Sequence, residues 1–281
     1  FKWKGDLGGC LCACHGGSVP SMQTRLAVIG GGNMARSILS GAISAGILQP
    51  EEIVGADPDP LSQEFFTSMG VSSVADALDL PESSQLLLAV KPQIFEHIAS
   101  AVSGDIVISI MAGVSTQKIS EAITHCKVIR IMPNLPCSIG LGAAGMALGA
   151  SATDADAELA SQLFESIGTV EIVDESLMDA VTAVSGSGPA YLFLLAEAMI
   201  EGGVQAGLDL ATADSLVRQT LVGAAGLLLG DERSATQLRE AVTSKGGTTA
   251  AALAVMNERG VPKAIVEAVV AARDRGRELG K

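Results

Sequence analysis

The chain has 281 residues, of which 48% are hydrophobic and 17% charged, with a formal net charge of −13 and a mean hydropathy of +0.41. The length favours about two domains. The acidic balance, with no segment rich in lysine and arginine, excludes a nucleic-acid-binding protein. The hydropathy leaves two explanations, a membrane span or a large buried oligomer interface.

The membrane explanation fails on the candidate segments. A span needs roughly 20 consecutive apolar residues. Residues 128–150 contain Arg130, Asn134, two prolines and four glycines, and the run 221–230 is too short. We therefore expect a cytoplasmic protein that spans no membrane and buries its excess apolar surface between copies.

Residues 1–21 show no apolar periodicity, and Met22 follows them directly before a strand-like run. Three of the five cysteines fall at positions 10, 12 and 14, a spacing that matches neither C-x-x-C nor C-x-x-C-H. We interpret this segment as a disordered or expression-derived leader, with a metal site as the alternative. The other two, Cys126 and Cys137, lie in apolar surroundings and are expected to be buried free thiols.

From Arg25 onward, short apolar runs alternate with helical segments, the pattern of βαβ units around a parallel sheet. The expected strands are residues 26–29, 52–56, 85–90, 105–110 and 127–132, with edge strands at 145–148 and 169–173. The expected helices between them are residues 34–45, 61–69, 94–102 and 154–167. The sequence therefore predicts an α/β domain over residues 22–174.

After Asp174 the strand pattern stops, and the remaining residues, 175–281, are predicted to form an all-α domain. The expected helices are residues 176–183, 189–206, 211–230, 235–242, 248–259 and 261–279. Between the first two, the run Ser185-Gly-Ser-Gly-Pro189 predicts a tight corner, with Pro189 at the first helical position and Ser187 or Gly188 as the cap. The corner would pack the helices and help to shape a pocket.

Residues 30–35, Gly-Gly-Gly-Asn-Met-Ala, follow the first strand directly and open a helix. In the pattern G-x-G-x-x-A, Gly30 permits the tight turn, Gly32 allows close approach to a pyrophosphate, and Ala35 lets the helix pack against the sheet. A glycine triplet alone occurs in many tight turns. Its place between a strand and a helix predicts a Rossmann-type dinucleotide-binding domain, with the pyrophosphate at the helix N-terminus.

Asp57 ends the second strand, somewhat later than the usual acid in this motif. A carboxylate there can accept hydrogen bonds from an adenosine ribose and would repel a 2′-phosphate. This observation favours NADH, but the cofactor stays open between NADPH and NADH. The alternative for Asp57-Pro-Asp-Pro60 is a solvated turn.

Five further segments accompany the glycine loop: Ala89-Val-Lys-Pro-Gln93, Met111-Ala-Gly-Val114, Met132-Pro-Asn-Leu-Pro136, Asp179 through Tyr191, and Ser244-Lys-Gly-Gly-Thr-Thr249. With these motifs in this order, the chain resembles the pyrroline-5-carboxylate reductase family. The resemblance covers about Met22 to the C-terminus.

The resemblance implies NAD(P)H-dependent reduction of 1-pyrroline-5-carboxylate to L-proline, the last step of proline biosynthesis. It also implies that the helical domain mediates dimerisation, with larger rings of dimers in some members. The cofactor contacts that it implies are Ile29, Gly30, Gly31, Gly32, Asn33, Met34, Ala89, Val90, Lys91, Pro92, Met111, Ala112, Gly113 and Glu175. The substrate-pocket residues that it implies are Glu232, Val242, Gly247, Thr248 and Thr249. Ala241 stands where some members carry asparagine.

Gly246 to Thr249 come directly before an apolar helical run. Two glycines expose backbone N–H groups and a threonine hydroxyl can cap the helix, which makes a site for a substrate carboxylate. An ordinary capped helix start is the alternative. We expect Thr249 to be the catalytic hydrogen-bond donor to the imine nitrogen, unless the imine binds already protonated. His97 and His125 have no recognisable catalytic setting, and Lys91 and Lys245 are equally consistent with structural or solvated roles.

Two other functions compete with this one. Another two-domain reductase, such as a β-hydroxyacid dehydrogenase, would need a catalytic lysine in the helical domain, and residues 189–206 contain none. A non-catalytic NAD(P) sensor would leave residues 244–249 without a role, and it would bind cofactor without turnover.

Overall fold

The computed structural model describes residues 24–99, 102 and 104–280. The predicted leader and its three cysteines lie outside the described residues. Cys126 and Cys137 are buried and unpaired, as predicted.

The first half of the chain forms one eight-stranded sheet in the order β3-β2-β1-β4-β5-β6-β7-β8. All neighbouring strands are parallel except the pair β6 and β7. The order of the first six is that of a doubly wound dinucleotide-binding sheet, whose ligand crevice lies where the order reverses beside β1. The strands are β1 (Leu26–Ile29), β2 (Ile53–Ala56), β3 (Ser72–Val74), β4 (Gln85–Leu88), β5 (Ile106–Ser109), β6 (Lys127–Met132), β7 (Gly142–Leu148) and β8 (Gly168–Ile172).

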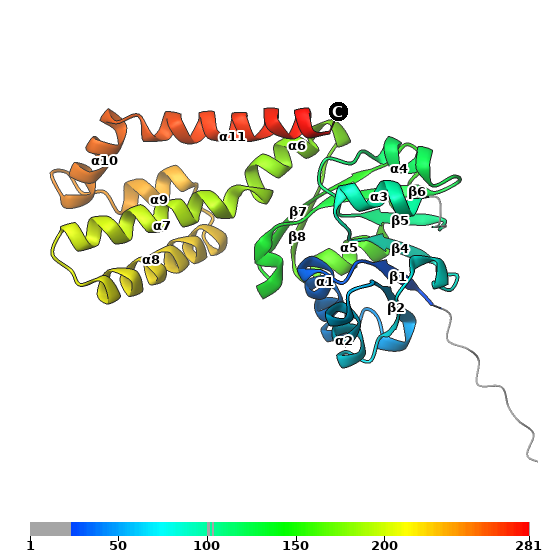
Figure 1. Ribbon diagram of the computed structural model, residues 1–281. Helices are drawn as coiled ribbons and strands as arrows, with labels where there is room; N and C mark the ends of the chain where they lie inside the picture. The colour runs from blue at the N-terminus through cyan, green and yellow to red at the C-terminus, as the bar shows by residue number, and fades with distance from the viewer. Residues whose placement is uncertain (1–23, 100–101, 103, 281) are drawn as a thin grey trace, which may run out of the picture.

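Helices cover both faces of this sheet (Figure 1). They are α1 (Asn33–Ser44), α2 (Pro60–Ser68), α3 (Pro92–Ile98), α4 (Thr116–Ala122) and α5 (Glu158–Glu165). Alternate residues of a strand point to opposite faces, so Leu26 and Val28 join one core with α1 and α5, whereas Ala27 and Ile29 join the other with α3 and α4. The predicted α/β Rossmann-type fold is confirmed.

Two elements of this half were not predicted from the sequence, and one expected edge strand was wrong. The strand β3 and the helix α4 were not predicted, because β3 has only three residues, two of them serine, and α4 has only seven. Residues 145–148 were expected at an edge, but they belong to the longer β7, which pairs with β6 on one side and β8 on the other.

The second half of the chain is entirely helical among the described residues from Glu175 onward. Its elements are η5 (Glu175–Leu177), α6 (Met178–Val181), η6 (Thr182–Gly186), α7 (Gly188–Gln205), α8 (Leu210–Gly230), α9 (Ala235–Ala241), α10 (Thr248–Glu258) and α11 (Val261–Leu279). The helices α7 and α8 pair and project away from the sheet, and α11 returns to it beside α6 (Figure 1).

A π-turn, η6, stands where a tight corner was expected at residues 185–189, so the helical run is continuous, but α7 begins at Gly188 with Pro189 in its first turn, as predicted. The Ser187 N–H donates to the carbonyl of Thr182, five residues back. A side chain also bonds to the backbone of this π-turn: the Tyr191 hydroxyl donates to the carbonyl of Ala183 at 3.0 Å. Ser187 is the predicted N-cap of α7 but makes no capping hydrogen bond with its side chain.

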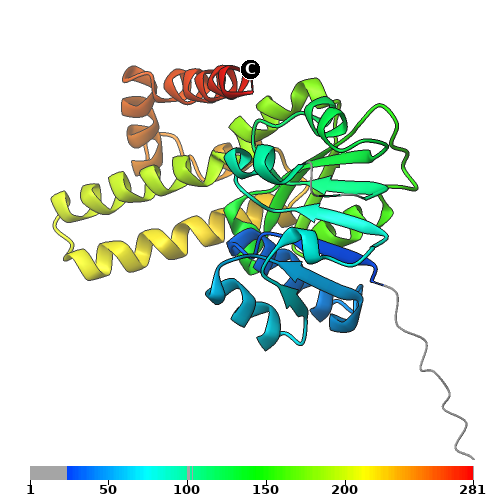
Figure 2. The same ribbon diagram turned by 45° about the vertical axis from the view of Figure 1, so that its right-hand side comes forward.

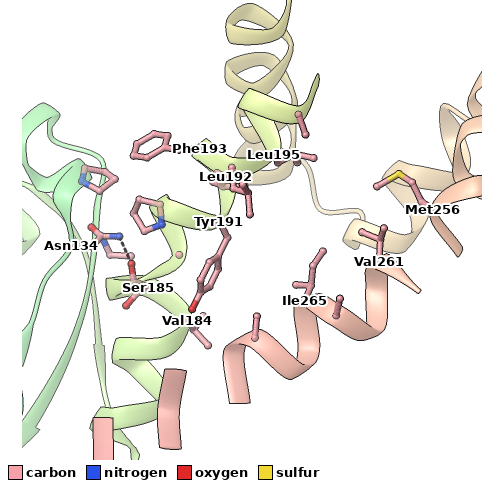
Figure 3. A pocket seen from close by; sticks show the side chains of 18 of the residues that line it. Asn134, Val184, Ser185, Tyr191, Leu192, Phe193, Leu195, Met256, Val261 and Ile265 are labelled. Carbon is pink, nitrogen blue, oxygen red and sulfur yellow. Dashed lines mark hydrogen bonds between the residues drawn. The ribbon is translucent and has the colours of Figure 1, made fainter. Parts of the chain in front are cut away.

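Pro189 leaves a further carbonyl in this region without a helical donor. It has no N–H, so it cannot donate to the carbonyl of Ser185, four residues back. That carbonyl accepts a hydrogen bond from Asn134 Nδ2 at 3.1 Å instead. The Asn134 side chain therefore joins the sheet domain to the helical domain (Figure 3).

The helical half leaves a large apolar surface uncovered within one copy. None of the 18 residues of α7, all of them described, is buried, and α8 buries only Ala213 and Val217. Large apolar side chains that are exposed here include Leu192, Phe193, Leu194, Leu216, Val222, Leu227, Leu228 and Leu229. An apolar patch of this extent marks an interaction surface.

One described helical run, Glu175–Gln205, is long and apolar enough to cross a membrane by length and composition alone. Only 6% of its most apolar stretch is buried within the chain. The run contains Glu197 and Glu201 in α7, and its exposed apolar side chains are part of the surface described above.

Candidate active site

The glycine loop makes a tight connection from β1 to α1. Gly30 has a φ of +100°, and a Cβ added there would lie 2.6 Å from the carbonyl oxygen of Ala89. A Cβ on Gly31 would lie 2.5 Å from the Cβ of Ser62. Gly32 is the N-cap of α1 without a side-chain hydrogen bond, and a Cβ there would meet nothing within 4 Å. The first turn of α1 therefore presents backbone N–H groups to open space, which suits a pyrophosphate.

The three predicted cofactor segments lie at one edge of the sheet. They follow β1, β4 and β5, which are neighbouring parallel strands, so their carboxyl ends coincide. After β4, the Ala89 N–H donates to the Ile29 carbonyl at 2.8 Å. After β5, Met111 is buried, and Gly113 turns with a φ of +74°. Lys91 is exposed and caps α3, and Pro92 is its first residue.

Asp57 lies directly beside the glycine loop. Its Oδ2 accepts a hydrogen bond from the Gly31 N–H at 2.6 Å, and its Oδ1 accepts one from the Asp59 N–H at 2.8 Å. The predicted acid at the end of β2 therefore contacts the loop that would bind the cofactor.

Arg36, in the first turn of α1, was not singled out in the sequence. Its Nε donates to the Gly31 carbonyl at 2.9 Å and its Nη2 to the Leu61 carbonyl at 3.2 Å. Its guanidinium lies 4.7 Å from the centre of the Phe65 ring. The signal that could have found it is a cation in the first turn after the glycine motif.

Glu175 lies where the helical half begins. Its carboxylate accepts hydrogen bonds from the Thr116 N–H at 2.7 Å and the Thr116 hydroxyl at 2.5 Å. It also pairs with Arg130 at 3.2 Å, where the Arg130 side chain is only 9% exposed. Glu175 thus holds the start of α4, two residues beyond the segment Met111 to Val114. Thr116 and Arg130 were not among the predicted site residues.

The predicted substrate residues lie around α9 and at the start of α10. Glu232 precedes α9, Val242 follows it, and both are exposed. Gly247 is the N-cap of α10, and Thr248 and Thr249 are its first two residues. The expected threonine cap was wrong, because the N-cap position of α10 is occupied by Gly247 and no side chain caps the helix. The first N–H groups of α10 therefore remain available. Gly247 lies so close to Ser244 that a Cβ there would be 2.3 Å from its hydroxyl oxygen.

The two halves of the predicted site do not meet within one copy. In Figure 1, α10 lies toward the end of the helical half that is away from the sheet, and Figure 2 also shows it apart from the sheet. The glycine loop lies beside β1 in the sheet domain. The cofactor segments and Thr249 are therefore brought to separate parts of the chain.

Between α7 and α11 lies an apolar hollow of about 1170 Å³. Leu192 and Leu195 line one side, and Val261 and Ile265 face them across it (Figure 3). Asn134 reaches its edge from the sheet domain. The lining is almost wholly apolar and offers few groups for a carboxylate or a nucleotide.

Neither His97 nor His125 lies in a catalytic setting; both are exposed. Within residues 24–99, 102 and 104–280, no group of three or more His, Cys, Asp or Glu side chains is arranged to hold a metal ion. Burial raises the pKa of the Cys126 and Cys137 thiols, which leaves them unreactive near neutral pH.

The sheet order, the glycine loop and the acid at the end of β2 define a Rossmann-type NAD(P)H-dependent oxidoreductase with a helical second domain. Residues 175–279 match the family described as pyrroline-5-carboxylate reductase dimerisation, and residues 25–113 match that described as NADP oxidoreductase coenzyme F420-dependent. The chain belongs to the pyrroline-5-carboxylate reductase family. The predicted family, fold and cofactor class are confirmed.

Relatives and solved structures agree with this assignment. A pyrroline-5-carboxylate reductase of Synechocystis is 41% identical over 266 residues, covering 92% of this chain and 100% of the relative. One of Pisum sativum is 39% identical, covering 90% and 95%. The structure of a pyrroline-5-carboxylate reductase from Coxiella burnetii has a TM-score of 0.84 at 35% identity, covering 92% and 99%. That of Plasmodium falciparum pyrroline carboxylate reductase, with NADP bound, has a TM-score of 0.80 at 26% identity, covering 92% and 99%.

Proposed function

We propose that the chain reduces the C=N bond of 1-pyrroline-5-carboxylate to give L-proline, as a cytoplasmic homodimer in which each active site is shared by two copies. The observation that carries the activity is the open start of α10, Gly247-Thr-Thr249, in a chain of this family that also carries an open glycine loop. The first supplies a carboxylate site and the second a cofactor site.

Bound NAD(P)H would supply the hydride to the imine carbon. The residues of this chain hold the substrate and pass to the ring nitrogen a proton taken up from solvent. The N–H groups in the first turn of α10 hold the substrate carboxylate, since the helix dipole and the unpaired donors favour an anion there. The Thr249 hydroxyl, half-buried, donates a hydrogen bond to the ring nitrogen and orients the C=N bond. Glu232 precedes α9 and Val242 follows it, and the family resemblance assigns both to the substrate pocket.

The shared site follows from the separation within one copy. Hydride transfer requires reacting atoms within about 3–3.5 Å, and α10 lies far from the glycine loop in both views (Figures 1 and 2). A second copy solves this, because two-fold symmetry brings α10 of one chain to the cofactor edge of the other. The same contact covers the exposed apolar faces of α7 and α8.

The activity is tested by following oxidation of NADH and NADPH with pyrroline-5-carboxylate. Thr249→Val keeps the side-chain shape and removes the hydroxyl, so we expect a fall in kcat/KM of about 100-fold. Thr67→Val, on the exposed face of α2, is the matched control and should leave turnover unchanged. Equal turnover in all three proteins would remove Thr249 from the mechanism, and cofactor binding without any turnover would favour the sensor.

The shared site is tested by mixing two inactive variants. Gly32→Glu fills the space where the pyrophosphate would lie without a clash in the chain itself, and Thr249→Val removes the substrate donor. A mixed dimer would contain one intact site, so co-refolded variants should recover about a quarter of wild-type activity. No recovery in verified mixed dimers would place each site within a single copy.

The oligomeric state is tested by light scattering on the eluting protein. A dimer has twice the chain mass of 28.5 kDa. A larger ring of dimers, which the sequence also predicts, would give a higher even multiple. A monomer at micromolar concentration would contradict both the shared site and the proposed cover for α7 and α8.

A further inference from the structure

The loop after β5 belongs to the half of the sheet that would receive the nicotinamide. A doubly wound sheet binds a dinucleotide across two mononucleotide-binding halves, which meet where the strand order reverses. In this chain the two halves meet between β1 and β4. Asp57 follows β2 and lies in the half that would take the adenosine, so the loops after β4 and β5 would face the nicotinamide. The position of the loop 111–114 therefore bears on hydride transfer.

This loop is anchored at its two ends and turns sharply between them. Met111 and Val114 are buried in the core that the sheet forms with α3 and α4, whereas Ala112 is exposed. Gly113 is half-buried and has a φ of +74°, a conformation that residues with side chains rarely adopt. The tip of the loop, Ala112-Gly113, is therefore the part whose position depends on a neighbour outside this core.

That neighbour is the last turn of α11, from the helical half of the chain. A Cβ added to Gly113 would lie 3.8 Å from the carbonyl oxygen of Leu279 and 3.9 Å from the nitrogen of Gly280. A Cβ added to Gly280 would lie 3.3 Å from the carbonyl oxygen of Gly113. Backbone therefore packs against backbone at this point, and Figure 1 shows this end of α11 beside the sheet domain.

Two glycines of α11 permit the close approach. Gly276 and Gly280 are four residues apart, so they lie on the same face of the helix. Gly276 packs against α6, where an added Cβ would lie 3.0 Å from Oδ1 of Asp179. The end of α11 is thus held against α6 while it contacts the tip of the loop.

We propose that the last turn of α11 positions the nicotinamide end of the cofactor, because its contact through Gly280 fixes the tip of the loop 111–114. The inference rests on the cofactor part of the proposed function and concerns the nicotinamide end alone. The adenosine and the pyrophosphate would be bound by the other half of the sheet and the glycine loop. A change at Gly280 should therefore weaken binding of the complete dinucleotide and leave binding of its adenosine end unchanged.

The test compares NADH and NADPH with ADP, which carries the adenosine and two phosphates but neither the second ribose nor the nicotinamide. Calorimetry gives the three dissociation constants for the full-length protein and for Gly280→Val, whose side chain pushes against the Gly113 carbonyl. We expect both cofactor constants to rise at least about fivefold, the lower end of what overpacking costs. The constant for ADP should stay the same. We also expect kcat to fall about tenfold, since a misplacement of about 1 Å can cost about 100-fold.

Glu278→Val is the matched control, because it adds the same side chain to the same turn, two residues away and so on another face. Glu278 is exposed and pairs with Arg275 at 2.8 Å. This variant should leave all three constants unchanged. Deleting residues 279–281 removes the contact without overpacking, and it should also weaken the binding of NADH and NADPH alone. Unchanged cofactor affinities in Gly280→Val and in the deletion variant, or an equal loss for ADP, would overturn the proposal.

The failures of this inference and of the reductase assignment are distinguishable, because the binding measurements need no turnover. A selective loss of NADH and NADPH binding, in a chain that does not reduce pyrroline-5-carboxylate, would reject the activity and keep the role of Gly280. Reduction by Gly280→Val at the wild-type rate and with wild-type affinities would reject the role of Gly280 alone.

Discussion

The junction between the two domains can be tested at Asn134, because its side chain donates to the Ser185 carbonyl the hydrogen bond that Pro189 cannot make. Asn134 is 9% exposed. Its Nδ2 donates to the Ser185 carbonyl at 3.1 Å, and its Oδ1 accepts from the Ala143 N–H at 3.0 Å. Asn134→Ala removes both partners at once and leaves a carbonyl and an N–H without them.

The size of the effect follows from these two bonds. A polar group that loses its partner in a buried place costs about 1–3 kcal/mol. Because the two groups are only partly buried, we expect Asn134→Ala to lower the free energy of unfolding by about 2–4 kcal/mol. Urea denaturation at a fixed protein concentration measures this change.

Pro189→Ala makes the prediction specific. The alanine supplies the N–H that the proline lacks, and in the Asn134→Ala background it can donate to Ser185 in place of the lost amide. We expect the double variant to recover about 1 kcal/mol relative to the sum of the single variants. Costs that add within about 0.5 kcal/mol would show that the two positions are independent, and the account of the π-turn would be refuted.

Further predictions concern separate parts of the chain. The pKa of Asp156 is lowered to about 2, mainly by a hydrogen bond from Lys127. The ionised Asp156 therefore stabilises the fold above about pH 4, and this contribution is lost as the pH falls towards 2. Asp156→Asn should remove this part of the pH dependence of the melting temperature. Gly145→Ala would place a Cβ 2.6 Å from Val181 and should lower the melting temperature. An unchanged melting temperature would show that α6 can move to make room for the methyl group. Tyr191→Phe removes a hydrogen bond to a carbonyl eight residues earlier and should cost about 1 kcal/mol in urea; a neutral result would deny that bond a role in the π-turn.

The cofactor half of the site could be predicted from sequence because its determinants are local. The glycine spacing, the apolar runs and the order of βαβ units together place three loops at one edge of a sheet. The short elements β3 and α4 escaped this reasoning because they carry too few residues for a periodic signal. For α4 one signal was present: Ser115 caps it, accepting a hydrogen bond from the Lys118 N–H at 3.1 Å.

The helical half was harder because its determinants are distant in sequence. Serine, glycine and proline at residues 185–189 favour a break by every local rule. The helical run nevertheless continues, and Asn134, 51 residues earlier, donates to the Ser185 carbonyl the hydrogen bond that Pro189 cannot make. The local preference for a break at residues 185–189 was therefore not followed, and the spacing of residues in the sequence gives no sign of the Asn134–Ser185 contact.

This override also bears on where the reaction can occur. A true corner at Pro189 could have folded the following helices back over their own cofactor edge. Because the helix instead runs through η6 into α7, it carries α8, α9 and α10 away from the sheet (Figure 1). The proposed substrate loop before α10 is thereby separated from the glycine loop of its own chain. The proposed shared site and the exposed apolar faces of α7 and α8 then share one structural basis, which is the path of the chain through η6 into α7.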